Sequence, residues 1–150
     1  MTPRALDWRI IERKLMRMRR LLRQLVALGA FDRARLDEDE IATLAAERIL
    51  TLLVDLAFAT NSHIAVNVLA DVPDSYRHSF ELARKAGLID RRLAEALAPA
   101  AGMRNVLVHG YDEVDYDKVQ VALAATPELF GEYVTQVSRW LADRVEATPD

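Results

Sequence analysis

Apolar residues recur along the first part of the chain at intervals of three and four positions. The series consists of Trp8, Ile11, Leu15, Met18, Leu22 and Leu25. This spacing is typical of one face of an α-helix. Gly29 follows this series, and glycine is the residue that most often ends a helix. The pattern therefore predicts an amphipathic first helix over residues 8–28.

A second apolar series with helical spacing covers residues 41–57. Its members are Ile41, Leu44, Ala45, Ile49, Leu52, Leu53, Leu56 and Ala57. Four acidic residues at 37–40 precede it, where the positive end of the helix dipole favours negative charge. We expect this second long helix to end or bend near Asn61, Ser62 or beyond. The chain must break before Pro73, because proline disfavours helical backbone at the residue that precedes it.

Capping residues and prolines set the remaining boundaries. Ser75 and Asp90 are predicted N-caps of two further helices, the first of which ends at Gly87. Pro99 is expected to kink or split the second of them. A terminal helix is predicted from about residue 127 to 145. Together these elements predict an all-α fold, an antiparallel bundle of four to five helices.

Composition narrows the class of protein. The chain has 150 residues, of which 51% are hydrophobic and 29% charged, so we expect a single domain over residues 1–150. It has no cysteine, which excludes thiol nucleophiles, cysteine-based zinc sites and disulfides. Neither a secretory signal nor a membrane span is recognisable in the sequence. A cytoplasmic protein without membrane association is the expectation.

Charge is distributed unevenly along the chain. Residues 1–35 carry a balance of +7, whereas residues 36–150 carry −10. Clustered arginines suit the binding of nucleic-acid phosphates, whatever the net charge of the protein. Candidate RNA-phosphate contacts repeat along one face of the first helix, at Arg9, Arg13, Arg17 and Arg20. The alternative is an arginine-rich helix face that contacts only solvent.

The segment 104–111 carries the most informative polar residues. Asn105 and His109 are four positions apart, so they share a helix face, and we expect a hydrogen bond between them. Arg104 and His109 differ by about 140° around a helix. They converge on one ligand only if the helix end distorts or a second protomer completes the site, which points to a dimer cleft.

The chemistry of these side chains suits RNA. An arginine can clamp a phosphate with two hydrogen bonds, and a histidine can move a proton near neutral pH. Together, Arg104 and His109 suit metal-free cleavage, in which a 2′-hydroxyl attacks its own phosphate. The non-catalytic alternative is that Arg104 forms a surface ion pair, His109 caps the helix and Tyr111 packs.

Other polar residues receive structural interpretations. The acidic segment 111–117 lacks the spacing of a calcium loop, so it is expected to be solvated and no metal site is predicted. Asp55 lies inside an apolar run and needs a partner. Pairing with an arginine is favoured, and a contribution to an active cleft is the alternative. His63 is expected to be hydrogen-bonded within the structure.

The order of these motifs over residues 8–145 resembles the HepT family of HEPN-domain proteins. The resemblance includes Asn61 to Ile64, Pro73 to Arg77 and, above all, residues 104–111. That last segment has the family's order of arginine, polar residue, three further positions, histidine, one position and tyrosine. Gly110 departs from many relatives, which carry a bulkier or acidic residue there.

The resemblance implies a toxin that is a helical homodimer with a composite ribonuclease site in the cleft between protomers. Arg104 would stabilise charge on the scissile phosphate, His109 would act as general acid or base, and Asn105 would orient the site. No metal and no cofactor of the chain's own are implied. The alternative is a non-catalytic helical dimer that binds a nucleotide or a partner protein.

The family's partner is an antitoxin, MntA, which is a minimal nucleotidyltransferase. It silences the toxin by transferring AMP from ATP to the tyrosine of the motif, which here is Tyr111. A further hetero-oligomer with this partner is an open possibility. The added phosphodiester charge and base would lie two residues from His109, where they would repel and obstruct an RNA backbone.

Overall fold

The computed structural model describes residues 6–110 and 112–146, and these residues form an all-α fold with no strand among them. The helices are α1 (Trp8–Leu28), α2 (Arg33–Glu38), α3 (Glu40–Ile64), α4 (Tyr76–Lys85), α5 (Arg91–His109) and α6 (Tyr116–Glu146). A π-helical turn over Ala65–Leu69 continues α3. The predicted fold class is confirmed, and the short α2 is the element that the prediction of four to five helices did not include.

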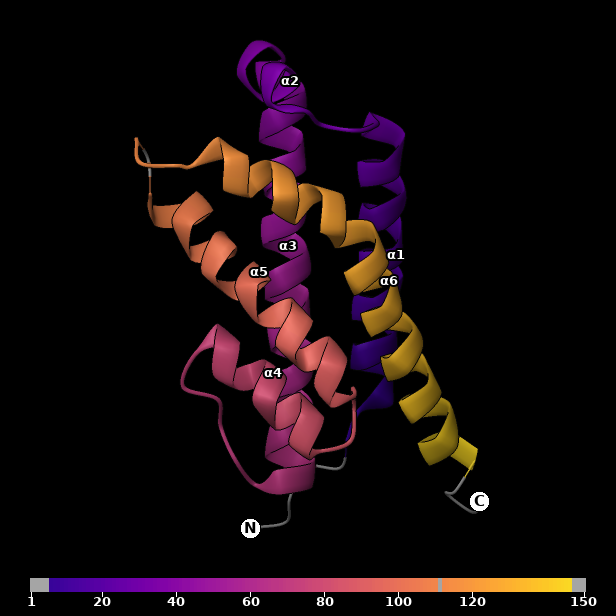
Figure 1. Ribbon diagram of the computed structural model, residues 1–150. Coiled ribbons are helices and arrows are strands. Elements are labelled where there is room, and N and C mark those ends of the chain that lie inside the picture. The colour runs from indigo at the N-terminus through magenta and orange to yellow at the C-terminus, as the bar shows by residue number, and fades with distance from the viewer. Residues whose placement is uncertain (1–5, 111, 147–150) are drawn as a thin grey trace.

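Helix α3 lies in the middle of the bundle (Figure 1). Helices α1 and α6 pack against each other and against α3 on one side, and α4 and α5 form the other side. Apolar side chains from all these helices form one core. Within the described part of the chain, no helix has an apolar stretch long enough to cross a lipid bilayer.

The predicted caps are confirmed. Gly29 ends α1 with a φ of 85°, a backbone conformation that glycine adopts without steric cost. Ser75 Oγ accepts a hydrogen bond from the backbone N–H of His78 at 3.0 Å. Asp90 Oδ1 accepts one from the backbone N–H of Leu93 at 2.8 Å. These side chains therefore fix where α4 and α5 begin.

The prediction that Ile41 and Leu44 belong to the inner face of α3 is wrong. Ile41 is 83% exposed and Leu44 is 57% exposed. Ala42 and Thr43 are buried instead, and the Thr43 hydroxyl donates a hydrogen bond to the carbonyl of Leu36 on α2. The unpredicted short helix therefore turns the small residues of α3 inward and leaves two large apolar side chains in solvent.

Two prolines lie inside helices that continue past them. Helix α5 runs through Pro99 without a break. Helix α6 begins at Tyr116, well before the predicted start at Pro127, which is an internal residue. A proline removes one backbone donor, and here the neighbouring Thr126 hydroxyl donates to the Ala122 carbonyl at 2.6 Å in the same turn. This local hydrogen bond accompanies the continuation of α6.

A buried network of polar side chains joins α3, α4 and α6. The Tyr133 hydroxyl on α6 donates to Asn61 Oδ1 on α3 at 2.6 Å. The Asn61 amide in turn donates to Ser79 Oγ on α4 at 3.2 Å. Ser79 donates to the backbone carbonyl of Tyr76 at 2.7 Å. The network therefore fixes the first turn of α4 against the core.

Candidate functional site

Three side chains from three helices meet at one carboxylate. Asp55 lies on α3, Tyr76 is the first residue of α4, and Arg104 lies in the second half of α5. Arg104 Nε donates a hydrogen bond to Asp55 Oδ1 at 3.0 Å. The Tyr76 hydroxyl donates to the same oxygen at 2.9 Å. The arginine partner predicted for Asp55 is thus Arg104, the arginine of the 104–111 segment.

The aromatic ring of Tyr76 supports the arginine from one side. The guanidinium carbon of Arg104 lies 4.6 Å from the centre of this ring, within the range of a cation–π contact. The ring of Phe58 packs against Tyr76 with a centroid separation of 4.5 Å. Burial raises the pKa of the Tyr76 hydroxyl, and its hydrogen bond to Asp55 raises it further. Tyr76 is therefore a neutral donor at physiological pH.

These contacts leave part of the guanidinium available. The side chain of Arg104 is 16% exposed and that of Asp55 is 35% exposed. Arg104 Nη1 makes a long hydrogen bond of 3.4 Å to Asn105 Oδ1. The Tyr76 hydroxyl also interacts with the Arg104 side chain, which lowers the pKa of Tyr76 against the larger effects of burial and Asp55. The arginine is held through Nε, while its outer N–H groups have capacity for an anion such as a phosphate.

The expected hydrogen bond between Asn105 and His109 is not formed in the described structure, because the Asn105 carbonyl oxygen instead accepts from Arg104. His109 is exposed and is the last residue of α5. Since α5 remains helical to its end, Arg104 and His109 stay on different faces within one protomer. Tyr111, the predicted modification site, lies outside the described residues.

Gly110 closes the end of α5 in a confined position. Its backbone N–H donates to the carbonyl of Val106 at 2.6 Å. A Cβ atom added to Gly110 would clash with that carbonyl oxygen. Glycine at position 110, where many relatives carry a larger residue, therefore lies where the backbone is packed closely against the Val106 carbonyl. A larger residue at this position would require the end of α5 to shift.

The basic face of α1 forms a shallow groove. Its lining is Arg13, Met16, Arg17, Arg19, Arg20 and Arg23. The fourth predicted arginine of this face, Arg9, lies over the ring of Trp8 instead. Helix α1 packs against α3 and α6 and makes no contact with α5 in the described structure. A single protomer therefore does not bring this groove against the helix that carries Arg104.

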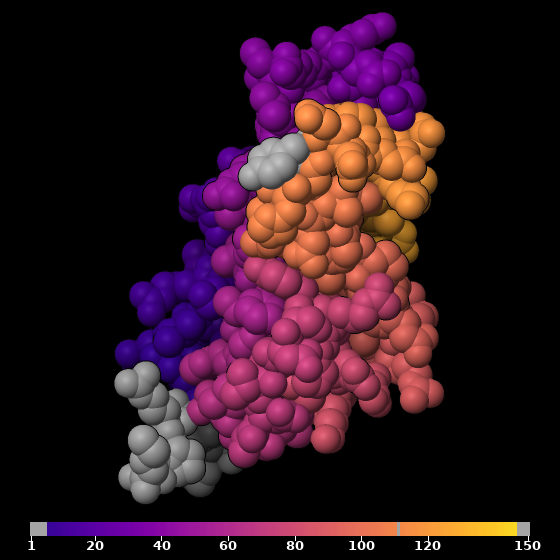
Figure 2. Space-filling model, turned by 90° about the vertical axis from the view of Figure 1, so that its left-hand side faces the viewer, coloured from indigo at the N-terminus to yellow at the C-terminus, as the bar shows by residue number. Residues whose placement is uncertain are grey.

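The site face appears in Figure 2, where the end of α5 and the start of α6 (orange) lie at the surface between α2 above and α4 below. The acidic residues after α5 are exposed, and Asp117 pairs with Arg33 of α2 at 3.2 Å.

No group of three His, Asp or Glu side chains within residues 6–110 and 112–146 is arranged to hold a metal ion. The prediction that the His63 ring is hydrogen-bonded is wrong for its Nε2 atom. This atom is buried and has no hydrogen-bond partner among the described residues.

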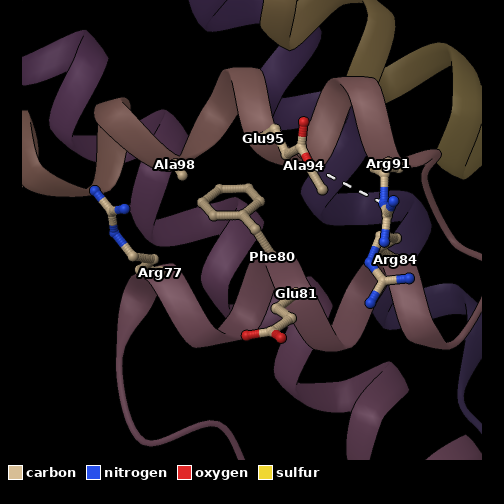
Figure 3. Close-up of a pocket in the computed structure, with 8 residues that line it drawn as sticks. All are labelled: Arg77, Phe80, Glu81, Arg84, Arg91, Ala94, Glu95 and Ala98. Atoms are coloured by element: carbon tan, nitrogen blue, oxygen red, sulfur yellow. Dashed lines mark ion pairs between the residues drawn. The ribbon is translucent and has the colours of Figure 1, made fainter.

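A separate pocket lies between α4 and α5 (Figure 3). Phe80 projects between the two helices, and the rim carries the charged residues Arg77, Glu81, Arg84, Arg91 and Glu95. Arg91 and Glu95 form an ion pair at 4.0 Å. The lining includes none of the predicted site residues, and its charges are of both signs, so the pocket does not extend the site around Arg104.

The sequence interpretation missed Tyr76 as a site residue. It lies in the Pro73 to Arg77 segment of the family resemblance, directly after the N-cap Ser75, but no spacing rule links it to Asp55 or Arg104. Asp55 carried a stronger signal, because a carboxylate inside an apolar helical run requires a partner. Both functions weighed for Asp55, an arginine pair and a place in the cleft, are compatible with its contact to Arg104.

A sequence model of the family described as "Ribonuclease HepT-like" matches residues 11–137 of the chain. Among individual proteins, the chain is 31% identical over 98 residues to the tRNA nuclease HepT of Aphanizomenon flos-aquae, which covers 65% of this chain and 67% of that protein. It is 33% identical over 73 residues to the mRNA nuclease HepT of Shewanella oneidensis, covering 49% of this chain and 52% of the relative.

The fold is also similar to that of solved structures. One is the tri-AMPylated HEPN toxin of Shewanella oneidensis in complex with its MNT antitoxin, with a TM-score of 0.77 and 23% sequence identity. The similarity covers 87% of this chain and 97% of that one. At this level of identity, the similarity establishes the shared all-α fold.

Proposed function

The chain belongs to the HepT-like ribonuclease family, and on that premise we propose that it is the toxin of a toxin–antitoxin pair and a metal-independent endoribonuclease. In this proposal RNA is the substrate, and the chain uses no cofactor of its own. The observation that carries the proposal is Arg104, whose guanidinium is held by Asp55 through Nε, while the long hydrogen bond from Nη1 to Asn105 leaves the outer N–H groups with capacity for a phosphate.

The proposed reaction is transesterification within the RNA backbone. The 2′-oxygen attacks the adjacent phosphorus, the bond to the 5′-oxygen of the next nucleotide breaks, and a 2′,3′-cyclic phosphate forms. The 2′-hydroxyl loses a proton and the departing 5′-oxygen gains one. His109 acts as general acid or base in this transfer, Arg104 stabilises the charge that develops on the phosphate, and Asn105 orients Arg104 through its carbonyl oxygen.

The proposed active form is a homodimer with a composite site. In a regular helix Arg104 and His109 point about 140° apart, so one phosphate is reached from both only when a second protomer contributes. The helices that carry Asp55 and Arg104 also expose large apolar side chains. Ile41 and Leu44 on α3 are 83% and 57% exposed, and Val106 on α5 is 40% exposed. Apolar surface of this kind favours association with a second copy.

The proposed antitoxin is an MntA-like minimal nucleotidyltransferase that transfers AMP from ATP to Tyr111. The support is the tyrosine two positions after His109 in the sequence, together with the AMPylated relative in complex with an MNT antitoxin. An added phosphodiester brings negative charge next to the phosphate-binding residues. Modification then weakens RNA binding and cleavage together.

The arginine face of α1 is the proposed contact for RNA phosphates beyond the scissile one. Arg13, Arg17 and Arg20 line one groove, to which Arg19 and Arg23 add further positive charge. Arg9 extends the same face toward the start of α1. Since α1 does not contact α5 in a protomer, such contacts belong to a longer RNA path over the surface.

The test is RNA cleavage with EDTA present, with total tRNA and a model messenger RNA as substrates. Wild-type protein, confirmed by intact mass to be unmodified at Tyr111, is expected to cut at least one of them. His109→Ala is expected to lower the rate by about a hundredfold or more. His78→Ala, which changes a histidine outside the motif, should cleave like the wild type. A wild type that cuts neither RNA contradicts the proposal and favours a non-catalytic dimer that binds a nucleotide or the partner.

A further inference from the structure

We infer that Asp55 and Tyr76 are positioning residues for catalysis, which act by holding the guanidinium of Arg104 in the orientation that the transition state requires. This inference rests on the proposed ribonuclease function. It concerns residues that lie far from the 104–111 segment in the sequence and reach it only through the fold. Its basis is the set of contacts that converge on one carboxylate oxygen.

Asp55 Oδ1 fixes two donors from two different helices. Arg104 Nε approaches it at 3.0 Å and the Tyr76 hydroxyl at 2.9 Å. An arginine side chain has four rotatable bonds, and ordering it costs conformational entropy. The ion pair with Asp55 meets that cost in the folded protein, before any RNA binds. Arg104 is therefore already ordered when RNA binds, so its ordering does not reduce the free energy of RNA binding.

Tyr76 restricts rotation of the Arg104 guanidinium group. The guanidinium carbon lies 4.6 Å from the centre of the Tyr76 ring, and Phe58 on α3 packs against that ring. The backbone of Tyr76 is itself held by Ser79, which belongs to the buried network with Asn61. The support under Arg104 is thus connected to the core of the bundle.

The orientation has a chemical consequence. With Nε bonded to Asp55, the Nη donors form the outer edge of the guanidinium, and within the described part of the chain Nη1 makes a long hydrogen bond to Asn105. Charge on the non-bridging phosphate oxygens increases as the 2′-oxygen attacks. Donors that are already aligned stabilise that increase without reorganising. Loss of alignment should therefore reduce kcat more than it reduces the affinity for RNA.

Stability alone does not account for this arrangement. The two side chains are partly exposed, at 16% for Arg104 and 35% for Asp55, and ion pairs in contact with solvent contribute little to folding. The bundle contains another interhelical ion pair between an arginine of α5 and a carboxylate, in which Glu132 on α6 contacts Arg92, whose side chain is 68% exposed. That pair lies at the other end of α5 and has no contact with the site, so it provides a control for the loss of an interhelical ion pair.

The experiment compares wild type, Asp55→Asn, Tyr76→Phe and the control Glu132→Gln. Asparagine keeps the size of Asp55 and one acceptor oxygen, removes the charge and replaces the second oxygen with an NH2 group. Three quantities are measured: kcat for RNA cleavage, Kd for an uncleavable oligonucleotide with a 2′-deoxy group at the cleavage position, and the NMR signal of the Arg104 Nε–H. That signal is assigned by its loss in Arg104→Lys. Circular dichroism and thermal unfolding verify that each variant is folded.

We expect Asp55→Asn to lower kcat by about tenfold or more while Kd changes by less than about threefold, and to shift the Arg104 Nε–H signal. Tyr76→Phe should act in the same direction with a smaller effect, because it keeps the ring under the guanidinium. Glu132→Gln should leave kcat, Kd and the Arg104 signal unchanged.

A kcat for Asp55→Asn within twofold of the wild type overturns the inference, as does a fall in kcat that is matched by an equal rise in Kd. An unchanged Arg104 Nε–H signal overturns it as well. Failure of the proposed function is a separate result, because it appears as a wild-type protein that cleaves no RNA. The NMR comparison does not depend on cleavage and still tests the contact between Asp55 and Arg104.

Discussion

The hydroxyl of Tyr133 on α6 lies 2.6 Å from Asn61 Oδ1 on α3, and both side chains are fully buried. Burial raises the pKa of the Tyr133 hydroxyl far above its usual range, so the tyrosine is a permanent donor. Asn61 passes the connection on to Ser79 of α4. Three helices thus share one chain of buried hydrogen bonds.

Removal of this hydroxyl is expected to destabilise the fold. Tyr133→Phe keeps the ring but takes the 2.6 Å donor from the buried oxygen of Asn61, which costs about 1 to 3 kcal/mol in the free energy of unfolding. Urea denaturation measures it. The control is Thr135→Val, which removes an exposed hydroxyl from the same helix and should change the free energy by less than about 0.5 kcal/mol. Equal changes in the free energy of unfolding for the two variants would show that the buried hydroxyl stabilises the fold no more than an exposed one.

The stability of the wild type is expected to depend on the ionisation of Glu47. Burial raises the pKa of this carboxyl, against the smaller opposing effect of Tyr116, and Oε1 has no hydrogen-bond partner in the described structure. A carboxyl with a raised pKa in the folded state loses stability as the pH rises from the ordinary carboxyl range through the raised value. Glu47→Gln has no such loss.

Thermal unfolding at pH 4 and pH 7 tests this. Glu47→Gln should have a higher Tm than the wild type at pH 7, by about 1 to 3 °C, and a smaller advantage at pH 4. Glu128→Gln, at an exposed position of α6, should show the same difference from wild type at both pH values. An advantage of Glu47→Gln that does not grow with pH contradicts the assignment.

Charge on the exposed apolar residues of α3 is expected to weaken the proposed dimer. Ile41→Asp has no cost in a monomer in which Ile41 is 83% exposed, but it places an unpaired carboxylate in the interface. Sedimentation equilibrium should show a dimer dissociation constant raised by about tenfold or more. Val121→Asp is the control, because Val121 is 71% exposed on α6. Dimerisation that responds equally to both substitutions would place the interface elsewhere.

The groove on α1 predicts a salt-dependent contribution to RNA affinity. Replacing Arg17 and Arg20 by glutamine should raise Kd for single-stranded RNA and lower the slope of log K against log salt by about 0.7 for each phosphate that is no longer neutralised. Cleavage at saturating RNA should be unchanged. Arg139→Gln, on the exposed side of α6, should alter neither quantity. An unaltered slope in the α1 variant would mean that these arginines contact only solvent.

Tyr111 is expected to be needed for neutralisation and dispensable for toxicity. Cells that express Tyr111→Phe should stop growing even when the nucleotidyltransferase partner is present, whereas wild type and Tyr116→Phe should be neutralised. Intact-mass measurement after incubation with partner and ATP should find AMP on the wild type and none on Tyr111→Phe. AMP attached to the Tyr111→Phe variant at another residue would refute the assignment.

Helix boundaries that depend on a single residue were predictable from the sequence. Gly29, Ser75 and Asp90 act through their own backbone or side chain within a few positions, and the fold uses each as expected. Pro127 shows the limit of such rules. Its missing N–H is one loss in a 31-residue helix with buried residues from Val119 to Leu141, so tertiary packing outweighs the local preference.

The orientation of a helix face was harder to predict. Ile41 and Leu44 fit the apolar series of α3, yet α2 packs against the other side through the contact of Thr43 with Leu36. A six-residue helix has too weak a periodicity to be recognised in advance. The site has the same limit, because the need of Asp55 for a partner is visible in the sequence, whereas the shared oxygen with Tyr76 is visible only once α3, α4 and α5 are placed.

Helix α5 is attached to the rest of the bundle unequally along its length. Its first turn is tied to α6 through Asp90 and Gln136, and Arg104 is tied to α3, but no side-chain hydrogen bond in the described structure holds the turn that ends at His109. Amide hydrogens of that final turn should therefore exchange with solvent faster than those around Arg104. Arg104 therefore lies in the part of α5 that is bonded to its neighbours and His109 at the end that is not, so the proposed modification of Tyr111 would require only a local opening, with the core still folded.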